Sequence, residues 1–264
     1  MTETFTLITG ASEGIGREFA KIAAARGRNV ILSARNAERL EALAAELSAE
    51  HGVQAIAIPA DLAEPGGAEA LWSKASDGRK IDFLVNNAGL GRHGPFDAET
   101  PGDGGWEREI ASIQVNVVAL TALMKLAIPH LKEAERGRVL NVASLAGFTP
   151  GPGMAVYHAT KAYVVSLSRA VKEELADTDV TVTALCPGAT ESEFFKSANM
   201  RSARITQIGK PMTAREVAEE GYDAAIRGDS VAVTGALNIV ARWATRLLPS
   251  ALVAPITKKV LAKV

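Results

Sequence analysis

The sequence predicts an α/β fold built on a parallel sheet, and three observations support this prediction. Short apolar runs alternate with longer stretches in which apolar residues recur every three or four positions, the pattern of successive βαβ units. The first apolar run leads directly into a glycine-rich turn and then into an alanine-rich helical pattern. The chain has 264 residues, 47% of them hydrophobic, so it can bury one large core but leaves little for a second domain. We therefore expect a single domain over residues 1–264.

Seven short apolar runs are predicted to form the strands of this sheet: Thr4–Ile8, Asn29–Ala34, Gln54–Pro59, Phe83–Asn86, Val139–Val142, Thr181–Cys186 and Val231–Thr234. Between them, the spacing of apolar residues predicts helices over 17–26, Glu38–His51, Gly67–Lys74, Gly105–Leu131, Ala155–Ala176 and Ala214–Ile226. Ligands of such sheets bind beyond the carboxyl ends of the strands. The residues that follow the strands should therefore converge on one cleft: Gly10, Arg35, Asp61, Asn87, Ser144 and Pro187.

The charge and the cysteine content of the chain argue against several classes of function. The formal net charge is −1 and the isoelectric point is near 6.5, so no overall basic field favours nucleic-acid binding. The first strand begins almost at Met1, which leaves no room for a signal peptide, and the single cysteine, Cys186, cannot form an internal disulfide. We therefore expect a cytoplasmic protein. Cys186 ends a strand and has no His, Asp or second Cys at ligand spacing, so we interpret it as a buried structural thiol and predict no metal site.

The segment Thr9-Gly-Ala-Ser-Glu-Gly-Ile-Gly16 has the features of a dinucleotide-binding turn between a strand and a helix. Gly10 allows a sharp turn at the end of the strand, Gly14 allows the backbone to approach a pyrophosphate, and Gly16 allows close packing of the helix. The free N–H groups at the helix N-terminus would then bind the phosphate anion.

Tyr157 and Lys161 are four residues apart in a predicted helix, so their side chains share one face. An ammonium beside a phenol favours the phenolate and lowers the phenol pKa from its usual value of about 10. A phenol tuned in this way can donate a proton to a substrate oxygen or accept one from it. Ser144 would place a hydroxyl at the same oxygen. His158 points about 100° away round the helix and is not assigned to this set.

The order and spacing of these motifs resemble those of the short-chain dehydrogenase/reductase family. The resemblance extends from residue 4 to about residue 235 and rests on Thr9-Gly-x3-Gly-x-Gly16, Asn86-Asn-Ala-Gly89, Ser144 and Tyr157-x3-Lys161. It implies a Rossmann-like, doubly wound parallel sheet of about seven strands with helices on both faces. It also implies that the serine, the tyrosine and the lysine act together, and that Asn116 completes a proton relay.

The resemblance further implies which residues hold a nicotinamide cofactor. In the family, Asp61 would contact the adenine, and the segment after the sixth strand would bind the nicotinamide carboxamide. The implied cofactor-binding residues are Gly10, Ser12, Glu13, Gly14, Ile15, Gly16, Arg35, Asp61, Leu62, Asn87, Ala88, Gly89, Tyr157, Lys161, Pro187, Gly188 and Thr190. On the residues alone, Asp61 could equally serve as a turn or cap residue at the end of its strand.

The residues after the second strand, Ala34 and Arg35, predict a preference for NADP(H). An acid at this place holds the ribose 2′-hydroxyl of NAD, whereas a cation receives the 2′-phosphate of NADP. The Arg35 guanidinium has the charge and the planar donors that suit a phosphate. Glu13 opposes this prediction, because a carboxylate that pointed inward would repel the phosphate. If Glu13 points to solvent and Arg35 only covers the adenine pocket, NAD(H) can serve as well.

Two segments are expected to complete the substrate side. Residues 190–212 carry Phe194, Phe195 and Met200 without a regular pattern, and we predict a lid that favours a hydrophobic carbonyl compound. The two phenylalanines could also serve only to pack this lid onto the body. Residues 237–264 extend beyond the last strand as two basic amphipathic helices, predicted at Leu237–Leu248 and Ala251–Val264, each shorter than the ~18 apolar residues of a membrane span. They could form a subunit contact, a cap beside the cleft or a peripheral membrane surface.

The function expected from these observations is an NADP(H)-dependent oxidoreductase that transfers a hydride between nicotinamide C4 and a carbonyl or secondary alcohol. We expect a homodimer or homotetramer. A nucleotide-binding scaffold without turnover is the alternative, and loss of Tyr157 or Lys161 would indicate it, but both are present. Sugar-nucleotide epimerisation needs a larger C-terminal substrate domain than the residues after Pro187 provide. Steroid, fatty-acyl, sugar and xenobiotic carbonyls all remain open as substrates.

Overall fold

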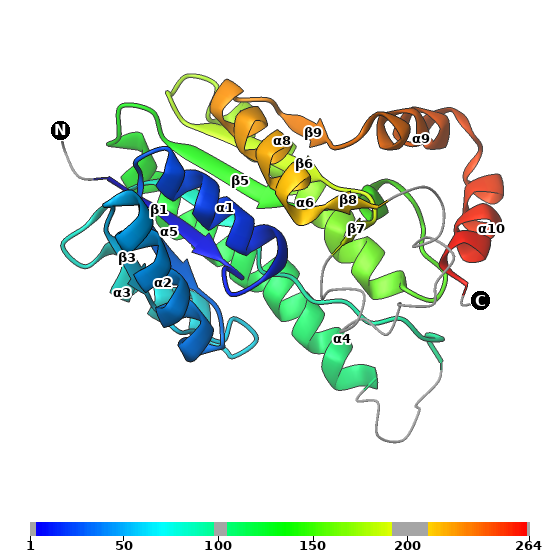
Figure 1. Ribbon diagram of the computed structural model, residues 1–264. Coiled ribbons are helices and arrows are strands. Elements are labelled where there is room, and N and C mark those ends of the chain that lie inside the picture. Colours follow the sequence, from blue (N-terminus) through cyan, green and yellow to red (C-terminus); the bar gives the residue numbers. More distant parts are fainter. Residues whose placement is uncertain (1–3, 98–104, 192–210, 263–264) are drawn as a thin grey trace.

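A seven-stranded parallel sheet forms the centre of the protein (Figure 1). The computed structural model describes residues 4–97, 105–191 and 211–262. The strands lie in the order β3-β2-β1-β4-β5-β6-β9, and every neighbouring pair is parallel. Their bounds are β1 Thr4–Thr9, β2 Asn29–Ser33, β3 Ala55–Ala57, β4 Lys80–Asn86, β5 Arg138–Val142, β6 Thr181–Cys186 and β9 Val231–Val233. The predicted fold class and all seven predicted strands are confirmed, although β4 begins at Lys80 rather than Phe83 and β3 is shorter than predicted.

Helices cover both faces of the sheet, as predicted for a doubly wound fold (Figure 1). The helices that pack on one face are α1 (Gly14–Ala25), α2 (Ala37–His51) and α8 (Ala214–Arg227). Those on the other face are α3 (Gly67–Ser76), α5 (Leu120–Lys132) and α6 (Ala155–Glu174). The strand order reverses between β1 and β4, and the crevice outside the carboxyl ends at such a reversal is where open sheets bind ligands.

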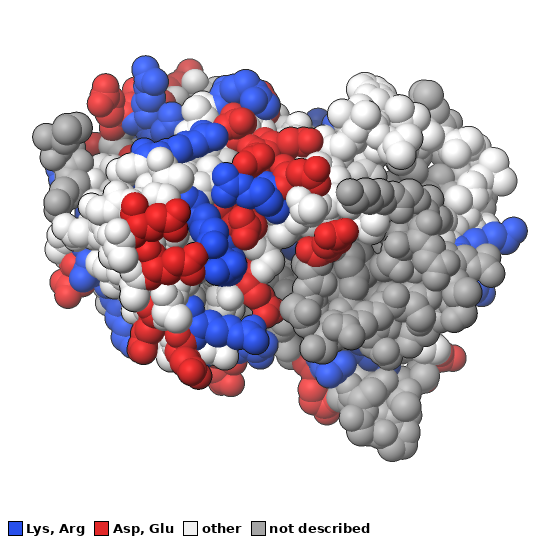
Figure 2. All heavy atoms as spheres, viewed as in Figure 1, with Lys and Arg blue, Asp and Glu red and all other residues white. Residues whose placement is uncertain are grey.

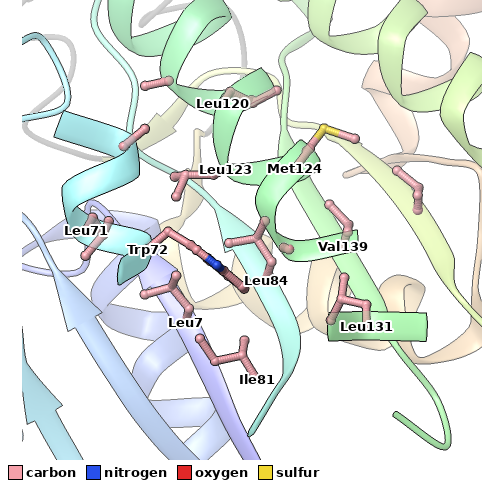
Figure 3. Packing of buried hydrophobic residues seen from close by; sticks show 14 of the residues in the cluster. Leu7, Leu71, Trp72, Ile81, Leu84, Leu120, Leu123, Met124, Leu131 and Val139 are labelled. Carbon is pink, nitrogen blue, oxygen red and sulfur yellow. The ribbon is translucent and has the colours of Figure 1, made fainter. Parts of the chain in front are cut away.

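Strand residues alternate between the two core layers because successive side chains point to opposite faces of a sheet. Leu7 and Leu84 pack with α3 and α5, and Figure 3 shows Trp72 of α3 lying beside them. Their sequence neighbours Ile8 and Val85 pack with α1 and α8 on the other face. All four strand residues are fully buried. The strands are therefore fixed from both sides, which holds their carboxyl ends level around the crevice.

The helix predicted over Gly105–Leu131 is interrupted. It consists of α4 (Gly105–Ile113), a π-helical turn η1 (Gln114–Ala119) and α5. A π-turn adds one residue to a helical turn and rotates the side chains around it, and such turns are frequent at functional sites. An 18-residue window of Gly105–Lys132 has a mean hydropathy of 1.6, so by length and composition alone this stretch could cross a membrane. In this fold its α5 part packs against β4 and against α3, so its hydropathy reflects its place in the core.

Most of the predicted lid, residues 192–210, lies outside the described residues, and with it Phe194, Phe195 and Met200. The two ends of the segment are described. They pair as the short parallel strands β7 (Thr190–Glu191) and β8 (Met212–Thr213), which bring both ends together beside β6. The lid therefore stays a prediction.

The two predicted C-terminal helices are confirmed as α9 (Ala236–Leu247) and α10 (Ser250–Leu261) (Figure 1). Val253 of α10 is buried, whereas Leu237, Val240 and Trp243 of α9 are exposed. Figure 2 shows charged side chains of both signs interspersed over the body, while the described residues at the end that carries α9 are mostly uncharged in the same view. The C-terminal extension therefore combines a packed inner side with an apolar outer side.

Candidate active site

One cleft of about 1050 Å³ lies at the carboxyl ends of the strands and contains nearly all the predicted site residues. It is lined by every residue of the predicted cofactor set except Gly16, together with Ser144. Asn116 and Gly16 lie behind the lining. The residues that follow six different strands therefore meet in one place, as the parallel topology requires.

The glycine-rich turn has the backbone shape that its sequence predicts. Gly10 and Gly14 have φ values of +66° and +56°, in the left-handed region that favours glycine. Gly16 acts by packing, because a Cβ there would overlap the carbonyl oxygen of Gly10 and the side-chain amide of Asn87. Gly14 and Ile15, the first residues of α1, line the cleft, so the N-terminus of this helix faces the cleft and offers its free N–H groups to an anion.

Asn87 ties the ends of β1 and β4 together beneath this turn. Its side-chain nitrogen donates to the carbonyl oxygens of Thr9 (2.9 Å) and Gly10 (3.2 Å). In return, the Thr9 hydroxyl oxygen accepts from the backbone N–H groups of Asn87 (3.0 Å) and Ala88 (3.1 Å). The turn is therefore held rigidly at the strand ends by residues of the Asn-Ala-Gly segment.

The cleft end nearest β2 carries two cations, Arg35 and Arg39, and two acids, Glu13 and Asp61, and the sequence prediction missed Arg39. Arg35, Arg39 and Glu13 all line this end, and a salt bridge of 2.7 Å joins Arg39 to the Glu13 carboxylate. Arg39 is placed by the start of α2, where Asn36 accepts a hydrogen bond from its backbone N–H. The charge of Glu13 is therefore balanced by Arg39, and among the described residues Arg35 has no ion pair.

The position of Asp61 is compatible with both of its predicted roles, a turn residue and an adenine contact. Its carboxylate accepts a hydrogen bond of 2.9 Å from the backbone N–H of Ala63, the contact of a turn residue. It also lines the cleft beside Leu62. The local turn thus fixes the acid at the edge of the pocket.

Ser144, Tyr157 and Lys161 meet at the other end of the cleft. Ser144 precedes the short 3₁₀ helix η2 (Leu145–Phe148), its oxygen accepts from the backbone N–H of Ala146 (3.1 Å), and its side chain is hydrogen-bonded to Tyr157. Tyr157 and Lys161 come from the first turns of α6. The Lys161 ammonium donates to the carbonyl oxygen of Val142 (2.8 Å) and lies 5.8 Å from the centre of the Tyr157 ring.

The electrostatics of this cluster differ from the sequence prediction. Burial raises the pKa of Tyr157 to about 12, and the hydrogen bond from Ser144 opposes this change only in part. Burial lowers the pKa of Lys161 to about 8. The prediction that Lys161 brings the Tyr157 pKa toward neutrality is therefore wrong for this geometry, because desolvation of the buried phenol dominates its pKa.

Asn116 is fully buried behind the catalytic corner, in the π-turn η1. Its side chain makes two hydrogen bonds to the backbone of Leu90 (2.9 and 2.8 Å) and donates a third to the hydroxyl of Thr160 (3.0 Å). A Cβ on Gly89 would lie 3.3 Å from both Asn116 Oδ1 and Lys161 Nζ. The two polar atoms therefore face the same glycine without bonding to each other, and the relay role of Asn116 stays a prediction.

Several lining residues were not predicted from the sequence. His158, which the helical spacing set apart, lines the cleft, where Nδ1 lies 2.8 Å from the carbonyl oxygen of Thr149. Helices α9 and α10 contribute a wall of the cleft, so of the three roles left open for them the structure supports the cap. This wall consists of Asn238, Ala241, Arg242, Thr245, Ile256, Thr257, Val260 and Leu261.

Cys186 is the buried structural thiol that its strand position predicted. It is fully buried at the end of β6, and burial raises the pKa of its thiol to about 12. A thiol with this pKa is not a nucleophile at neutral pH.

Comparison with known proteins places this site in a family. A family model described as short chain dehydrogenase matches residues 4–203. Nodulation protein G of Rhizobium sp. (strain N33) is 31% identical over 251 residues, covering 91% of this chain and 99% of that protein. The NADP-dependent 3-hydroxy acid dehydrogenase of Schizosaccharomyces pombe is 30% identical over 243 residues, covering 88% and 90%. A solved short-chain dehydrogenase from Sphingobium yanoikuyae in complex with NADPH is 34% identical, with 92% of both chains covered and a TM-score of 0.81.

The chain therefore belongs to the short-chain dehydrogenase/reductase family. The matched residues include the glycine-rich turn, Ser144, Tyr157 and Lys161, so the match covers the cleft as well as the fold. It is accordingly an oxidoreductase of the class that acts on hydroxyl and keto groups.

Proposed function

We propose that the protein transfers a hydride between C4 of NADP(H) and the carbon of a carbonyl or secondary alcohol. The observation that carries this proposal is the presence of Ser144, Tyr157 and Lys161 in the same cleft as the glycine-rich turn. The cofactor supplies the hydride when it is bound. The protein supplies a fixed position for the reacting atoms and a proton at the substrate oxygen.

The lining residues fit a phosphorylated dinucleotide. The positive φ angles of Gly10 and Gly14 leave the N-terminus of α1 open to a pyrophosphate. Arg35 offers a guanidinium to a 2′-phosphate at the β2 end. Pro187, Gly188 and Thr190 line the opposite end, where the nicotinamide would lie.

Tyr157 is the proposed proton donor in reduction and the acceptor in oxidation. With a pKa of about 12, its hydroxyl is protonated at neutral pH and can donate to a carbonyl oxygen. Ser144, hydrogen-bonded to Tyr157, would hold the same oxygen. Oxidation requires the phenolate, which the nearby Lys161 ammonium favours. Lys161 would also hold the nicotinamide ribose, and Asn116 would support a water between Lys161 and solvent.

Replacing Arg35 tests the cofactor assignment. We expect wild type to bind NADPH about one to two decades more tightly than NADH, because charge-assisted hydrogen bonds to phosphate contribute about 1.5–3 kcal/mol. Arg35→Ala should remove most of this preference. Ala34→Asp should reverse it, since the new carboxylate accepts from the ribose hydroxyl and repels the phosphate. Fluorescence titration of both nicotinamides measures these affinities, and equal affinities in wild type would refute the role of Arg35.

Arg39 provides a matched comparison at the same corner. Arg39→Ala removes the salt bridge to Glu13, so the unbalanced carboxylate should weaken NADPH binding by repulsion. The double change Glu13→Gln with Arg39→Ala should restore much of the affinity. If Arg39→Ala weakens NADPH binding and Glu13→Gln does not restore it, Arg39 contacts the phosphate directly.

The substrate is proposed to be a hydrophobic ketone or secondary alcohol. Apolar lining at this end of the cleft supports this choice, notably Leu90, Leu145, Phe148, Met154, Ile256 and Val260. A panel of ketones and alcohols, assayed by nicotinamide absorbance, tests the proposal. Turnover of none of them, combined with tight NADPH binding, would favour the alternative of a nucleotide-binding scaffold.

The proposal on assembly and location rests on the exposed apolar face of α9. The exposed side chains Leu237, Val240 and Trp243 on α9 would be covered by a second subunit in a homodimer or homotetramer, or by the surface of an anionic membrane. We favour a cytoplasmic oligomer. Light scattering after size-exclusion chromatography and co-sedimentation with anionic vesicles distinguish the two uses of this face.

A further inference from the structure

Arg242 is a cation in the substrate wall that the hydride-transfer mechanism does not use. It projects from α9 into the lining of the cleft, and its guanidinium lies 5.0 Å from the centre of the Phe148 ring. Phe148 ends the η2 turn that begins directly after Ser144. Arg242 therefore belongs to the catalytic end of the cleft rather than to the β2 end, where Arg35 and Arg39 lie.

A second observation places the same guanidinium near the end of β6. The buried thiol of Cys186 has a pKa raised by burial, and both Arg242 and Lys161 act on that pKa in the opposite direction. Both cations are therefore within electrostatic range of one atom at the end of β6. Asn238, one turn before Arg242, anchors this part of α9 by donating to the carbonyl oxygen of Thr234 (2.8 Å).

No acid balances Arg242 within the described part of the chain. The only carboxylates that line the described cleft are Glu13 and Asp61, and both follow strands at the adenosine end. The contacts of Arg242 there are the rings of Phe148 and Trp243. Around it the wall is apolar or uncharged, with Ala241, Thr245 and Ile256 as neighbours in the lining. A partly buried, unbalanced cation in an apolar wall favours an anionic ligand group, because its charge is poorly screened there.

We propose that Arg242 recognises a carboxylate on the substrate, so that the preferred substrates are keto acids or hydroxy acids with an apolar body. The inference rests on the proposed function and narrows it to a chemical class. The planar guanidinium can bind a carboxylate through two parallel hydrogen bonds. The ring of Phe148 holds it in place, which limits the side-chain freedom that binding would remove. The apolar wall would then contact the carbon skeleton between the carboxylate and the carbonyl.

Matched acid and ester pairs test this inference. The probes are 4-oxo-4-phenylbutanoate, 5-oxo-5-phenylpentanoate and their methyl esters, which keep the ketone and remove the charge. With NADP⁺ bound, which cannot reduce the ketone, wild type should bind the better acid about tenfold or more tightly than its ester, as measured by calorimetry. Where turnover occurs, kcat/KM should show the same preference. Arg242→Met should remove the preference while leaving ester binding unchanged, and Arg242→Lys should keep part of it.

Three controls make the result specific. Lys259→Met removes an exposed charge of α10 that does not line the cleft, and it should leave the acid preference unchanged. NADPH affinity should be the same in wild type and Arg242→Met, since a loss would mean that Arg242 holds a cofactor phosphate instead. Circular dichroism shows that each variant is folded.

The inference is overturned if acids and esters bind wild type equally, if no acid binds measurably, or if Arg242→Met keeps the preference. Failure of the proposed function would look different: no carbonyl compound, acidic or neutral, would oxidise NADPH. In that case the binding measurements would still decide the role of Arg242.

Discussion

Tyr157→Phe should lower turnover by on the order of 10² or more, because general acid–base catalysis by a positioned side chain contributes that much. The change removes only the phenolic hydroxyl, and the ring that packs in the cleft remains. Burial keeps the Tyr157 hydroxyl protonated, so in reduction this group is the proposed proton source at the substrate oxygen. Steady-state rates with NADPH and the best ketone of the panel measure the effect.

The same variant should bind NADPH almost as well as wild type, which separates catalysis from cofactor binding. Ser144→Ala is the matched comparison, since it removes the hydroxyl that is hydrogen-bonded to Tyr157 but leaves the phenol in place. A Tyr157→Phe protein with near-normal turnover would rule out the proposed mechanism, and water or another residue would have to deliver the proton.

Lys161→Met should weaken cofactor affinity and also reduce the rate, since Lys161 is proposed to hold the nicotinamide ribose and to stabilise the phenolate. NADPH titration and single-turnover rates at saturating NADPH measure the two effects separately. A change in only one of them would contradict the double role.

The fold should tolerate the loss of this charge. Burial lowers the pKa of Lys161 from 10.5 to about 8, so folding disfavours the ammonium. This cost to the free energy of folding is fully present below about pH 8. It is relieved as the pH rises from there toward 10.5, the pKa of Lys161 in the unfolded chain. Below pH 8, Lys161→Met should therefore have a melting temperature no lower than that of wild type, and a lower one would show that the hydrogen bond to Val142 outweighs the cost of burying the charge. The rate of wild type should fall as the pH rises through about 8, because Lys161 then loses its proton. Lys161→Met should show no such fall.

Much of the fold followed from local patterns. The seven strands were found because each is a short apolar run, and the helices because their apolar residues repeat every three or four positions. The π-turn η1 was missed, since an extra residue in one turn leaves the apolar pattern of a long helix nearly unchanged. The pairing of β7 with β8 was missed as well, because strands of two residues have no periodicity to detect.

The candidate site, like the fold, was predicted in part. The glycine turn and Ser144 were placed correctly in the cleft because each follows a strand, and the carboxyl ends of parallel strands meet. Arg39 and Arg242 lie on helices, and their place in the cleft depends on how those helices dock. The spacing of residues in the sequence does not predict that docking. The pKa of Tyr157 was predicted in the wrong direction because helical spacing reports the nearby lysine but not the depth of burial.

Different elements build the two ends of the cleft, and this separation matters for redesign. Arg35 and Arg39 are positioned by β2 and α2 at the adenosine end of the cleft, whereas Arg242 is carried by α9 and lies against Phe148 at the catalytic end. Changes in binding free energy at sites that share no partner usually add. Nucleotide preference and substrate preference should therefore be adjustable one at a time, with fold-changes that multiply when the substitutions are combined. A biocatalyst built on this scaffold could exchange its nucleotide without a new search for its substrate.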